Sequence, residues 1–318
     1  MDSRQFLGLE PTHNPYRWVL PVVPGISTAG GFLFGGCGLA AAVSAMEGTS
    51  GRKAVWATAQ YLSYAKPGET MDIDVILAVN GHQITQARAV CHVGDREILT
   101  VNAALGDRDL VENGQWEAMP VGIPGPHECS ERPHVLDRSG TISGRMAQRM
   151  VKGRERIEDL DGTPSDGQVL LWSRIPEVIE GVDAAALAIL GDFVPMGVGQ
   201  SLGIRGGGNS LDNTLRIGRL VPTEWVLIDI KVHGLARGFG SRPGVGNNAD
   251  MTSSLPKRPG MTVPLPGHLN THRDRLIELA DMGYTDIWSA ESDGADGFTP
   301  LALAAAWEPR LRLGTAII

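Results

Sequence analysis

Hydrophobic and polar residues alternate along several stretches of the first hundred residues. In Met71–Val79 the alternation places Met71, Ile73, Val75 and Leu77 on one face of a strand. Asn80-Gly81 follows directly, and this pair is typical of a two-residue hairpin turn. Similar apolar runs predict further strands at Tyr16–Val23, Ala54–Tyr64, Gln83–His92 and Ile98–Ala104. Together these stretches predict a meander of antiparallel strands.

One segment in this half of the chain has the pattern of a helix. Leu39–Glu47 is dominated by alanine and leucine, and no proline interrupts it. The glycine-rich loop Gly30–Gly38 precedes it, and Gly48 stands where a C-cap glycine belongs. A helix without a polar face must be covered on all sides by other structure. We therefore expect one buried helix wrapped by a curved antiparallel sheet.

The order of helix, glycine-rich loop and long strands occurs again in the second half of the chain. The elements are a strand at Val169–Trp172, a helix at Val182–Leu190, a glycine-rich loop at Gly199–Gly208, and strands at Ser210–Ile217 and Glu224–Val232. The intervening Gly106–Asp166 is proline-rich and then charged, and we interpret it as a connector with a short helix at Ile142–Val151. The chain is thus predicted to contain a tandem structural repeat.

The pattern changes near Asn247, and Met251–Gly260 has the composition of a linker. Strands are predicted beyond it at Met261–Leu265, Asp286–Ser289 and Leu311–Ile318, with helices at Arg273–Met282 and Thr299–Trp307. This βαβαβ order indicates a parallel sheet. The predicted organisation is a first repeat (1–119), a connector (120–167), a second repeat (168–246), a linker (247–260) and a tail (261–318).

Composition narrows the classes of function. The 318 residues include 28 Lys+Arg and 36 Asp+Glu, and the resulting net charge of −8 argues against a nucleic-acid partner. The three cysteines, Cys37, Cys91 and Cys129, lack the spacing of a disulfide framework or a zinc site. Trp18–Met46 carries no charge, but two prolines and six glycines exclude a continuous membrane-spanning helix there. We expect no signal peptide in Met1–Trp18, because Asp2, Glu10 and Pro11 stand where a basic region and an apolar stretch belong. We expect a soluble, cytoplasmic protein that does not insert into membranes.

Two short motifs could carry chemistry. Gly199–Gly203 matches the G-x-S-x-G elbow of serine hydrolases, with Ser201 as nucleophile, but a glycine triplet follows where that motif needs a helix. Asn209–Asn213 is more informative, because Asp212 enters a strand directly after a glycine-rich loop. Such a carboxylate can orient a water molecule or take its proton. The alternative interpretation is an aspartate that only caps the turn. His233 follows the last predicted strand of this repeat, where a histidine is more often a surface residue than a catalyst.

Several segments of residues 14–240 resemble the type II (TesB-like) acyl-CoA thioesterases, most closely actinobacterial members. The similar segments are Phe34–Ala40, Ala57–Leu62, Asn209–Asn213, Glu224–Leu227 and Arg237–Gly240. The resemblance implies an α+β tandem hotdog fold, in which each of two helices is wrapped by an antiparallel sheet. It also implies hydrolysis of acyl-CoA to a free acid and CoA, with no cofactor, metal or covalent serine. Double hotdogs often associate further with one another, so the resemblance also implies a homo-oligomer.

The resemblance also assigns site residues. Asp212 matches the family's active-site aspartate, and His233 stands where the family has a hydroxyl residue. Asn209 and Ser210 fall in the substrate-binding segment, and backbone N–H groups at Gly35 and Gly36 are expected to hold the oxyanion. The family's closing segment, G-x-L-L-A followed by S-Q, has no counterpart after Gly240. We therefore expect an incomplete second sheet and no equivalent of the family's glutamine.

The tail has a different resemblance. Met261–Gly267, Met282–Glu291 and Leu313–Ala316 are similar to the start of luciferase-like monooxygenases, TIM barrels of which many use F420 or FMN. Only three of eight strands are represented, with Ser289, Glu291 and Thr315 at strand ends. Because a barrel site needs loops from many strands, we expect no flavin pocket here.

Our leading hypothesis is an acyl-CoA thioesterase-like double hotdog joined to a barrel fragment. Three alternatives stay open at this point: a hotdog that binds acyl-CoA without hydrolysing it, an F420- or flavin-dependent oxidoreductase acting through the tail, and a serine esterase using Ser201. The sequence does not decide the acyl chain length or the origin of the junction, which could be a gene fusion, a deletion between neighbouring genes or an assembly error.

Overall fold

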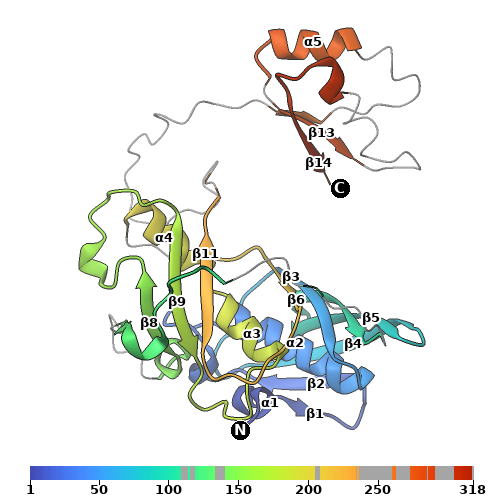
Figure 1. The fold of residues 1–318 in the computed structure, drawn as a ribbon. Helices are drawn as coiled ribbons and strands as arrows, with labels where there is room; N and C mark the ends of the chain where they lie inside the picture. The colour runs from blue at the N-terminus through green and yellow to red at the C-terminus, as the bar shows by residue number, and fades with distance from the viewer. Residues whose placement is uncertain are drawn as a thin grey trace. The chain divides into compact units, whose positions relative to one another are not determined.

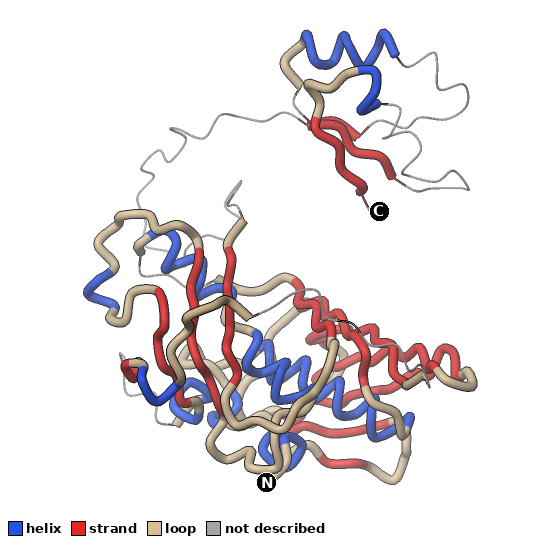
Figure 2. Tube along the Cα trace, viewed as in Figure 1, coloured by secondary structure: helices blue, strands red, loops and turns tan. Residues whose placement is uncertain are grey.

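The computed structural model describes residues 1–108, 114, 119–132, 140–204, 208–233, 235, 260–262, 273–284, 286–290 and 304–316. The chain divides into two compact units, Met1–Gly244 and Val245–Ile318. Figure 1 follows the elements along the chain, and Figure 2 distinguishes helices, strands and loops. Each unit is described by itself.

The first unit contains a seven-stranded antiparallel sheet around a central helix, α2 (Gly35–Ser50). The sheet has the order β1-β2-β4-β5-β6-β3-β10. Its strands are β1 (Glu10–Pro11), β2 (Arg17–Pro21), β3 (Ala54–Tyr61), β4 (Thr70–Asn80), β5 (Ile84–Val93), β6 (Arg96–Gly106) and β10 (Asp212–Arg216). Met71, Ile73 and Val75 of β4 are buried and their neighbours are more exposed, which confirms the predicted alternation.

The buried central helix is confirmed, but it is longer than the sequence predicts. It begins within the glycine-rich segment, at Gly35, and ends at Ser50 with Gly51 in the left-handed conformation (φ +70°). Gly48, the predicted C-cap, lies inside the helix instead. A Cβ atom at Gly48 would lie 2.5 Å from Trp18, so this glycine provides room for a packed tryptophan ring. The close contact with Trp18, and not a special backbone conformation, therefore explains why residue 48 is a glycine.

A second sheet and two further helices complete this unit. The sheet has the order β11-β9-β8-β7, formed by β7 (Ser130–Glu131), β8 (Ala147–Lys152), β9 (Gln168–Arg174) and β11 (Val226–Lys231). The helices are α3 (Ala184–Gly191) and α4 (Val194–Leu202), and a short helix α1 (Ser3–Leu7) precedes the first sheet. Single 3-10 turns occur at Pro24–Ile26, Pro126–Glu128, Ile142–Arg145 and Ile157–Asp159.

Two secondary-structure predictions in this region are wrong. The helix expected at 142–151 is a 3-10 turn followed by strand β8, whose alternate residues Gln148 and Met150 are buried against β9. The glycine-rich loop expected at 199–208 begins as the second half of α4, which ends at Gly203 in the left-handed conformation. In both cases packing against β9 or β11 overrides a weak local pattern.

The two sheets repeat one arrangement. In the first sheet β2 lies between β1 and β4, and in the second β9 lies between β8 and β11. After the helices, β3 and β10 occupy equivalent places in the chain and pair with each other, with Thr58 opposite Thr214. Within the described residues the second copy has no counterpart of β5 and β6. The expected incomplete second sheet is therefore what the described strands show.

The two copies share one core at the point where α2 and α3 pack together. Buried residues of both helices belong to the same hydrophobic cluster, among them Leu39, Val43 and Met46 from α2 and Ala185 and Ile189 from α3. Figure 1 shows the two helices side by side between the sheets. This close packing brings the beginning of α2 next to the end of α3.

The run Ala184–Leu202 is long and apolar enough to be a candidate membrane span by length and composition. It is not one continuous helix, because α3 ends at Gly191 and α4 starts at Val194. Most of its residues are buried within the fold, so the composition is explained by packing.

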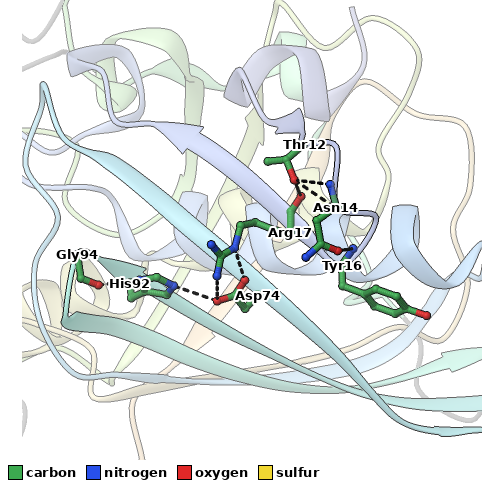
Figure 3. A network of polar contacts seen from close by, with 7 residues as sticks. All are labelled: Thr12, Asn14, Tyr16, Arg17, Asp74, His92 and Gly94. Atoms are coloured by element: carbon green, nitrogen blue, oxygen red, sulfur yellow. Dashed lines mark hydrogen bonds and ion pairs between the residues drawn. The ribbon is translucent and has the colours of Figure 1, made fainter.

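A polar network links three strands on the outer face of the first sheet (Figure 3). The Arg17 guanidinium donates to both carboxylate oxygens of Asp74, at 2.6 and 2.8 Å, and His92 Nε2 lies 3.1 Å from Asp74. The hydrogen bond from Arg17 holds the pKa of Asp74 below its usual range. The network joins β2, β4 and β5 far from the buried helix, so we assign it a structural role.

The second unit has the predicted βαβαβ order. Strands β12 (Gly260–Thr262), β13 (Asp286–Ala290) and β14 (Arg312–Ala316) form a parallel sheet in that order. Helix α5 (Arg273–Asp281) connects the first two, and a helical turn at 304–307 precedes the third. Ser289 and Thr315 lie opposite each other on β13 and β14, whereas Glu291 lies outside the described residues.

Candidate active site

A cavity of about 700 Å³ lies at the N-terminal end of α2. One wall is apolar and comes from both copies of the repeat; it includes Phe32, Leu33, Phe34, Phe193 and Met196. Polar residues converge where this wall meets the helix, namely Gly35, Tyr61, Asp192, Asn209 and Ser210. The cavity thus combines an apolar surface with a small group of polar atoms, as small-molecule sites commonly do.

Asp192, which follows α3, is the most buried polar side chain of this group, with 7% of its surface exposed. Its Oδ2 accepts a hydrogen bond from the N–H of Gly36 at 2.7 Å. Its Oδ1 receives two longer contacts, 3.3 Å from the Ser210 hydroxyl and 3.4 Å from the Asn213 amide. The carboxylate therefore caps α2 and at the same time contacts strand β10 and the loop before it.

Burial raises the pKa of Asp192 to about 6, although the bonds from Gly36, Ser210 and Asn213 each favour the charged form. The titratable groups that face it are Tyr61 from β3 and Cys37 from α2. Burial and the negative charge of Asp192 raise the pKa of both groups, so that both stay neutral near pH 7. Among the described residues, no basic side chain acts on the pKa of Asp192.

The two glycines that begin α2 allow this close approach. A Cβ atom at Gly35 would lie 2.7 Å from Asp192 Oδ2 and 3.2 Å from the Tyr61 hydroxyl. A Cβ atom at Gly36 would lie 2.8 Å from the carbonyl oxygen of Ala188 and 2.9 Å from Asp192 Cβ. Any larger residue at either position would separate the helix from the carboxylate or fill the polar end of the cavity.

Two hydrogen-bond donors at this point are open. The N–H of Gly35 belongs to the first turn of α2, which has no acceptors inside the helix, and it has no partner among the described residues. The hydroxyl oxygen of Tyr61 is buried and forms no direct hydrogen bond within the described part of the chain, although an interaction with the Asn213 side chain favours its charged form. Unpaired buried donors are costly unless a ligand or water satisfies them.

Basic residues lie along another wall of the cavity. Arg154 is anchored, since it donates to the backbone carbonyls of Gln200, at 3.0 Å, and Thr163. Arg132 donates to Gln148 at 2.8 Å. The side chain of Arg156 is exposed and has no ion pair with any described residue. The cavity lining therefore includes basic side chains, of which Arg154 also lies 3.6 Å from Asp161.

The structure brings four of the predicted site residues together. Gly35, Asn209 and Ser210 line the cavity, and Gly36 adjoins it. The N–H of Gly36 is bonded to Asp192, which leaves Gly35 as the open donor of the predicted pair.

The predicted pair of Asp212 and His233 is placed differently. Asp212 begins β10 with an exposed side chain and does not line the cavity. Its negative charge nevertheless raises the pKa of Tyr61. The two strands are joined there by a hydrogen bond from the Tyr61 N–H to the Leu211 carbonyl at 2.9 Å. His233 is exposed beyond β11, on the other sheet, and no contact joins it to Asp212.

Ser201 does not form a nucleophile elbow. It lies within α4, is 8% exposed, and its hydroxyl donates to the Gly197 carbonyl at 2.8 Å, as a serine inside a helix commonly does. Within the described residues, no group of three or more histidine, cysteine or acidic side chains could hold a metal ion. All three cysteines are buried and free.

Asp192 is the functional candidate that sequence reasoning missed. The sequence pattern predicts a helix over Val182–Leu190 and gives no role to Asp192 just beyond it. One signal was available, because an acidic residue directly after an apolar, alanine-rich helix is unusual unless it has buried partners. Its partners come from three distant segments, so the site itself could not be read from local sequence.

Residues 126–245 match the family described as the acyl-CoA thioesterase C-terminal domain. A crystal structure from Novosphingobium aromaticivorans, assigned as a thioesterase, is 28% identical, with a TM-score of 0.64 over 72% of this chain and 88% of that one. A structure from Thermobifida fusca assigned as a thioesterase II is 17% identical, with a TM-score of 0.63 over 75% and 90% of the two chains. No curated protein matches this sequence.

An acyl-CoA thioesterase II from Mycobacterium marinum has the same fold, with 18% identity and a TM-score of 0.54 over 74% of this chain and 88% of that one. The first unit thus has the hotdog fold of thioesterases, an α+β fold with antiparallel sheets. The family match at residues 126–245 is to a thioesterase domain, and these two neighbours show the fold alone. The family match does not extend to the βαβαβ unit.

Proposed function

We propose that this chain hydrolyses acyl-CoA thioesters to a free acid and CoA in the cavity at the N-terminal end of α2. The observation that carries the proposal is the pairing of an apolar wall with two open donors, Gly35 N–H and the Tyr61 hydroxyl. The apolar wall can pack against an acyl chain, and the two donors can form hydrogen bonds with the oxygen of the thioester carbonyl. The family match at residues 126–245 supports the same substrate class.

The proposed mechanism uses water as the nucleophile. The Gly35 N–H and the Tyr61 hydroxyl donate to the carbonyl oxygen and stabilise the negative charge that develops on it. The dipole of α2 adds to this effect at the helix N-terminus. Arg156, exposed on the basic wall, binds the phosphates of CoA. Asp192 is the carboxylate that lies beside these donors in the cavity. Asp212, the carboxylate of the sequence-based hypothesis, acts from the exposed start of β10 through its charge on Tyr61, and His233 lies apart on the other sheet.

The proposal is tested by thiol release from short- to long-chain acyl-CoAs. We expect the wild-type protein to release CoA and the Asp212→Asn variant to do so at least about 10-fold more slowly. His233→Ala should cost less, because its side chain lies beyond β11 on the other sheet. Asp95→Asn is the matched control, since Asp95 is an exposed aspartate in the turn between β5 and β6, and it should behave as wild type.

A binding module without activity is the outcome that would contradict the proposal. In that case no acyl-CoA of the panel would release CoA, although a cooperative thermal transition shows that the protein is folded. Acyl-CoA would then still raise the melting temperature, because a ligand that binds only the native state stabilises it.

A further inference from the structure

Aromatic side chains are concentrated in the wall of the cavity. The whole chain contains six phenylalanines and four tyrosines, and aromatic residues make up only 5% of it. Half of the phenylalanines and half of the tyrosines nevertheless line this one cavity, namely Phe32, Phe34, Tyr61, Tyr64 and Phe193. A general need for apolar surface would not concentrate one type of side chain in this way, so the wall is chemically specialised.

The rings are only partly buried by the protein itself. Phe34, Tyr61 and Phe193 pack against the core that the two copies share, but each remains half-buried. The rest of their surface belongs to the cavity wall. Aromatic side chains gain much of their stabilisation from burial, so a ligand that covers these rings gains free energy from the same effect.

Two of the rings adjoin the polar end of the cavity. Phe34 directly precedes Gly35, whose N–H is open, and Phe193 directly follows Asp192. The two rings come from different copies of the repeat, and their centroids lie 6.2 Å apart with the planes tilted by 49°. When a thioester carbonyl accepts a hydrogen bond from the Gly35 N–H, the first carbons of its acyl group therefore lie beside this pair.

A second aromatic pair extends the same wall. The rings of Phe32 and Tyr64 are 4.9 Å apart and tilted by 55°. A Cβ atom at residue 30 would lie 2.7 Å from the Phe32 ring, so Gly30 leaves room for this ring. Aliphatic lining residues such as Met196 and Ile204 belong to α4 or follow it. The aromatic part of the wall is thus built mainly from segments next to the beginning of α2.

We infer that the cavity selects thioesters whose acyl group carries an aromatic ring one or two carbons from the thioester carbon, and that Phe34 and Phe193 determine this specificity. The inference rests on the proposed function and specifies its substrate class. Neither the family match nor the structural neighbours specify an acyl group for this chain.

The physical basis is the attraction between aromatic rings beyond the effect of burial. Rings prefer tilted or offset contacts at centroid distances of about 4.5–7 Å, and Phe34 and Phe193 already adopt such a contact with each other. A third ring beside them can form the same type of contact with each. A saturated ring of the same size buries at least as much apolar surface but lacks the aromatic quadrupole. The difference between the two ligands therefore isolates the aromatic contribution.

The experiment measures kcat/KM by thiol release for three substrates with nine acyl carbons each: 3-phenylpropanoyl-CoA, 3-cyclohexylpropanoyl-CoA and nonanoyl-CoA. Two methylene groups separate each ring from the thioester, so the intrinsic reactivities are closely matched. We expect the wild type to prefer the phenyl substrate over the cyclohexyl substrate by roughly 3- to 10-fold. Hydrophobic burial alone would give equal values or the opposite order.

Substitutions then test which rings are responsible. Phe193→Leu and Phe34→Leu each keep an apolar side chain but remove a ring, and the ratio of the two kcat/KM values should fall towards one in both. Phe6→Leu is the matched control, because Phe6 is 3% exposed in the same core but does not line the cavity. It should retain the wild-type ratio. Thermal melting shows which variants are folded, and a ratio of two substrates is independent of the active fraction of each preparation.

Two results would overturn the inference while the proposed function stands. One is a wild-type enzyme that hydrolyses nonanoyl-CoA but shows no preference for the phenyl over the cyclohexyl substrate. The other is a preference that both folded variants, Phe34→Leu and Phe193→Leu, leave unchanged. Absence of thiol release from all three substrates by the folded wild type is a different result, because it overturns the proposed function and this inference together.

Discussion

Gly36→Ala is expected to abolish hydrolysis of acyl-CoA and to lower the free energy of unfolding by about 1–3 kcal/mol. The added Cβ atom would lie 2.8 Å from the Ala188 carbonyl oxygen and 2.9 Å from Asp192 Cβ. Both atoms belong to backbone or to the first carbon of a side chain, so neither can rotate away. To accommodate the methyl group, α2 and α3 must move apart.

That movement would damage the site as well as the core. The Gly36 N–H donates to Asp192 at 2.7 Å, and this bond would lengthen as the helices separate. The open donors at Gly35 and Tyr61 would also lose their position relative to the carboxylate. Activity and stability should therefore fall together, which urea denaturation and the thiol-release assay can show on the same preparation.

Gly38→Ala is the control for this prediction, because Gly38 is buried on the same helix. Its Cβ would meet Leu99 at 3.4 and 3.5 Å, which is ordinary van der Waals contact. Alanine also favours the helix over glycine by about 0.5–1 kcal/mol. We expect the stability of Gly38→Ala to equal or exceed that of the wild type, with activity retained. Equal effects of the two substitutions would contradict the proposed close packing at Gly36.

Asp192→Asn is expected to stabilise the fold at neutral pH while it removes activity. Burial raises the pKa of Asp192 from 3.8 to about 6. A carboxyl group with a raised pKa in the folded state stabilises the fold fully below pH 3.8, and this contribution is lost as the pH rises through 6. The shift of about two units corresponds to roughly 3 kcal/mol. Asparagine has no charge to desolvate and can still accept from Gly36.

The measurement is the free energy of unfolding of both proteins between pH 4 and pH 8. Their difference should be small at pH 4 and should grow in favour of Asp192→Asn as the pH rises through about 6. Comparing the two proteins removes the effect of carboxylates whose pKa is lowered, such as Asp74, because these are the same in both. Asp212→Asn makes the same change at an exposed aspartate and is the matched control.

A loss of stability in Asp192→Asn at pH 8 would mean that the carboxylate serves chiefly to cap α2. A gain in stability together with a loss of activity is the pattern expected where a protein retains a strained group for chemistry. The two measurements therefore separate a structural role of Asp192 from a catalytic one.

Much of the fold follows from local sequence. The alternation in Met71–Val79 and the Asn80-Gly81 turn are enough to predict β4 and its hairpin with β5, because a pleated strand with one buried face has a period of two. The apolar Leu39–Glu47 is enough to predict a covered helix. The change to alternating helix and strand beyond residue 260 is enough to predict a parallel sheet in the second unit.

Other features depended on partners that are far away in the sequence. The helix expected at 142–151 is strand β8 because β9 provides its hydrogen bonds, and α2 begins at Gly35 because Asp192 satisfies the N–H of Gly36. Local patterns carry no information about such partners, which are 18 to 156 residues distant in the chain.

The candidate site, like the fold, depends in part on local sequence and in part on partners that are distant in the chain. The sequence by itself determined most of the order of the elements and pointed to four residues at or beside the cavity: Gly35, Gly36, Asn209 and Ser210. Only the tertiary structure decided which acid is buried, since burial depends on how α2, α3 and β10 meet. The sequence contains many carboxylates, and burial by the surrounding structure is what distinguishes Asp192 from the exposed Asp212.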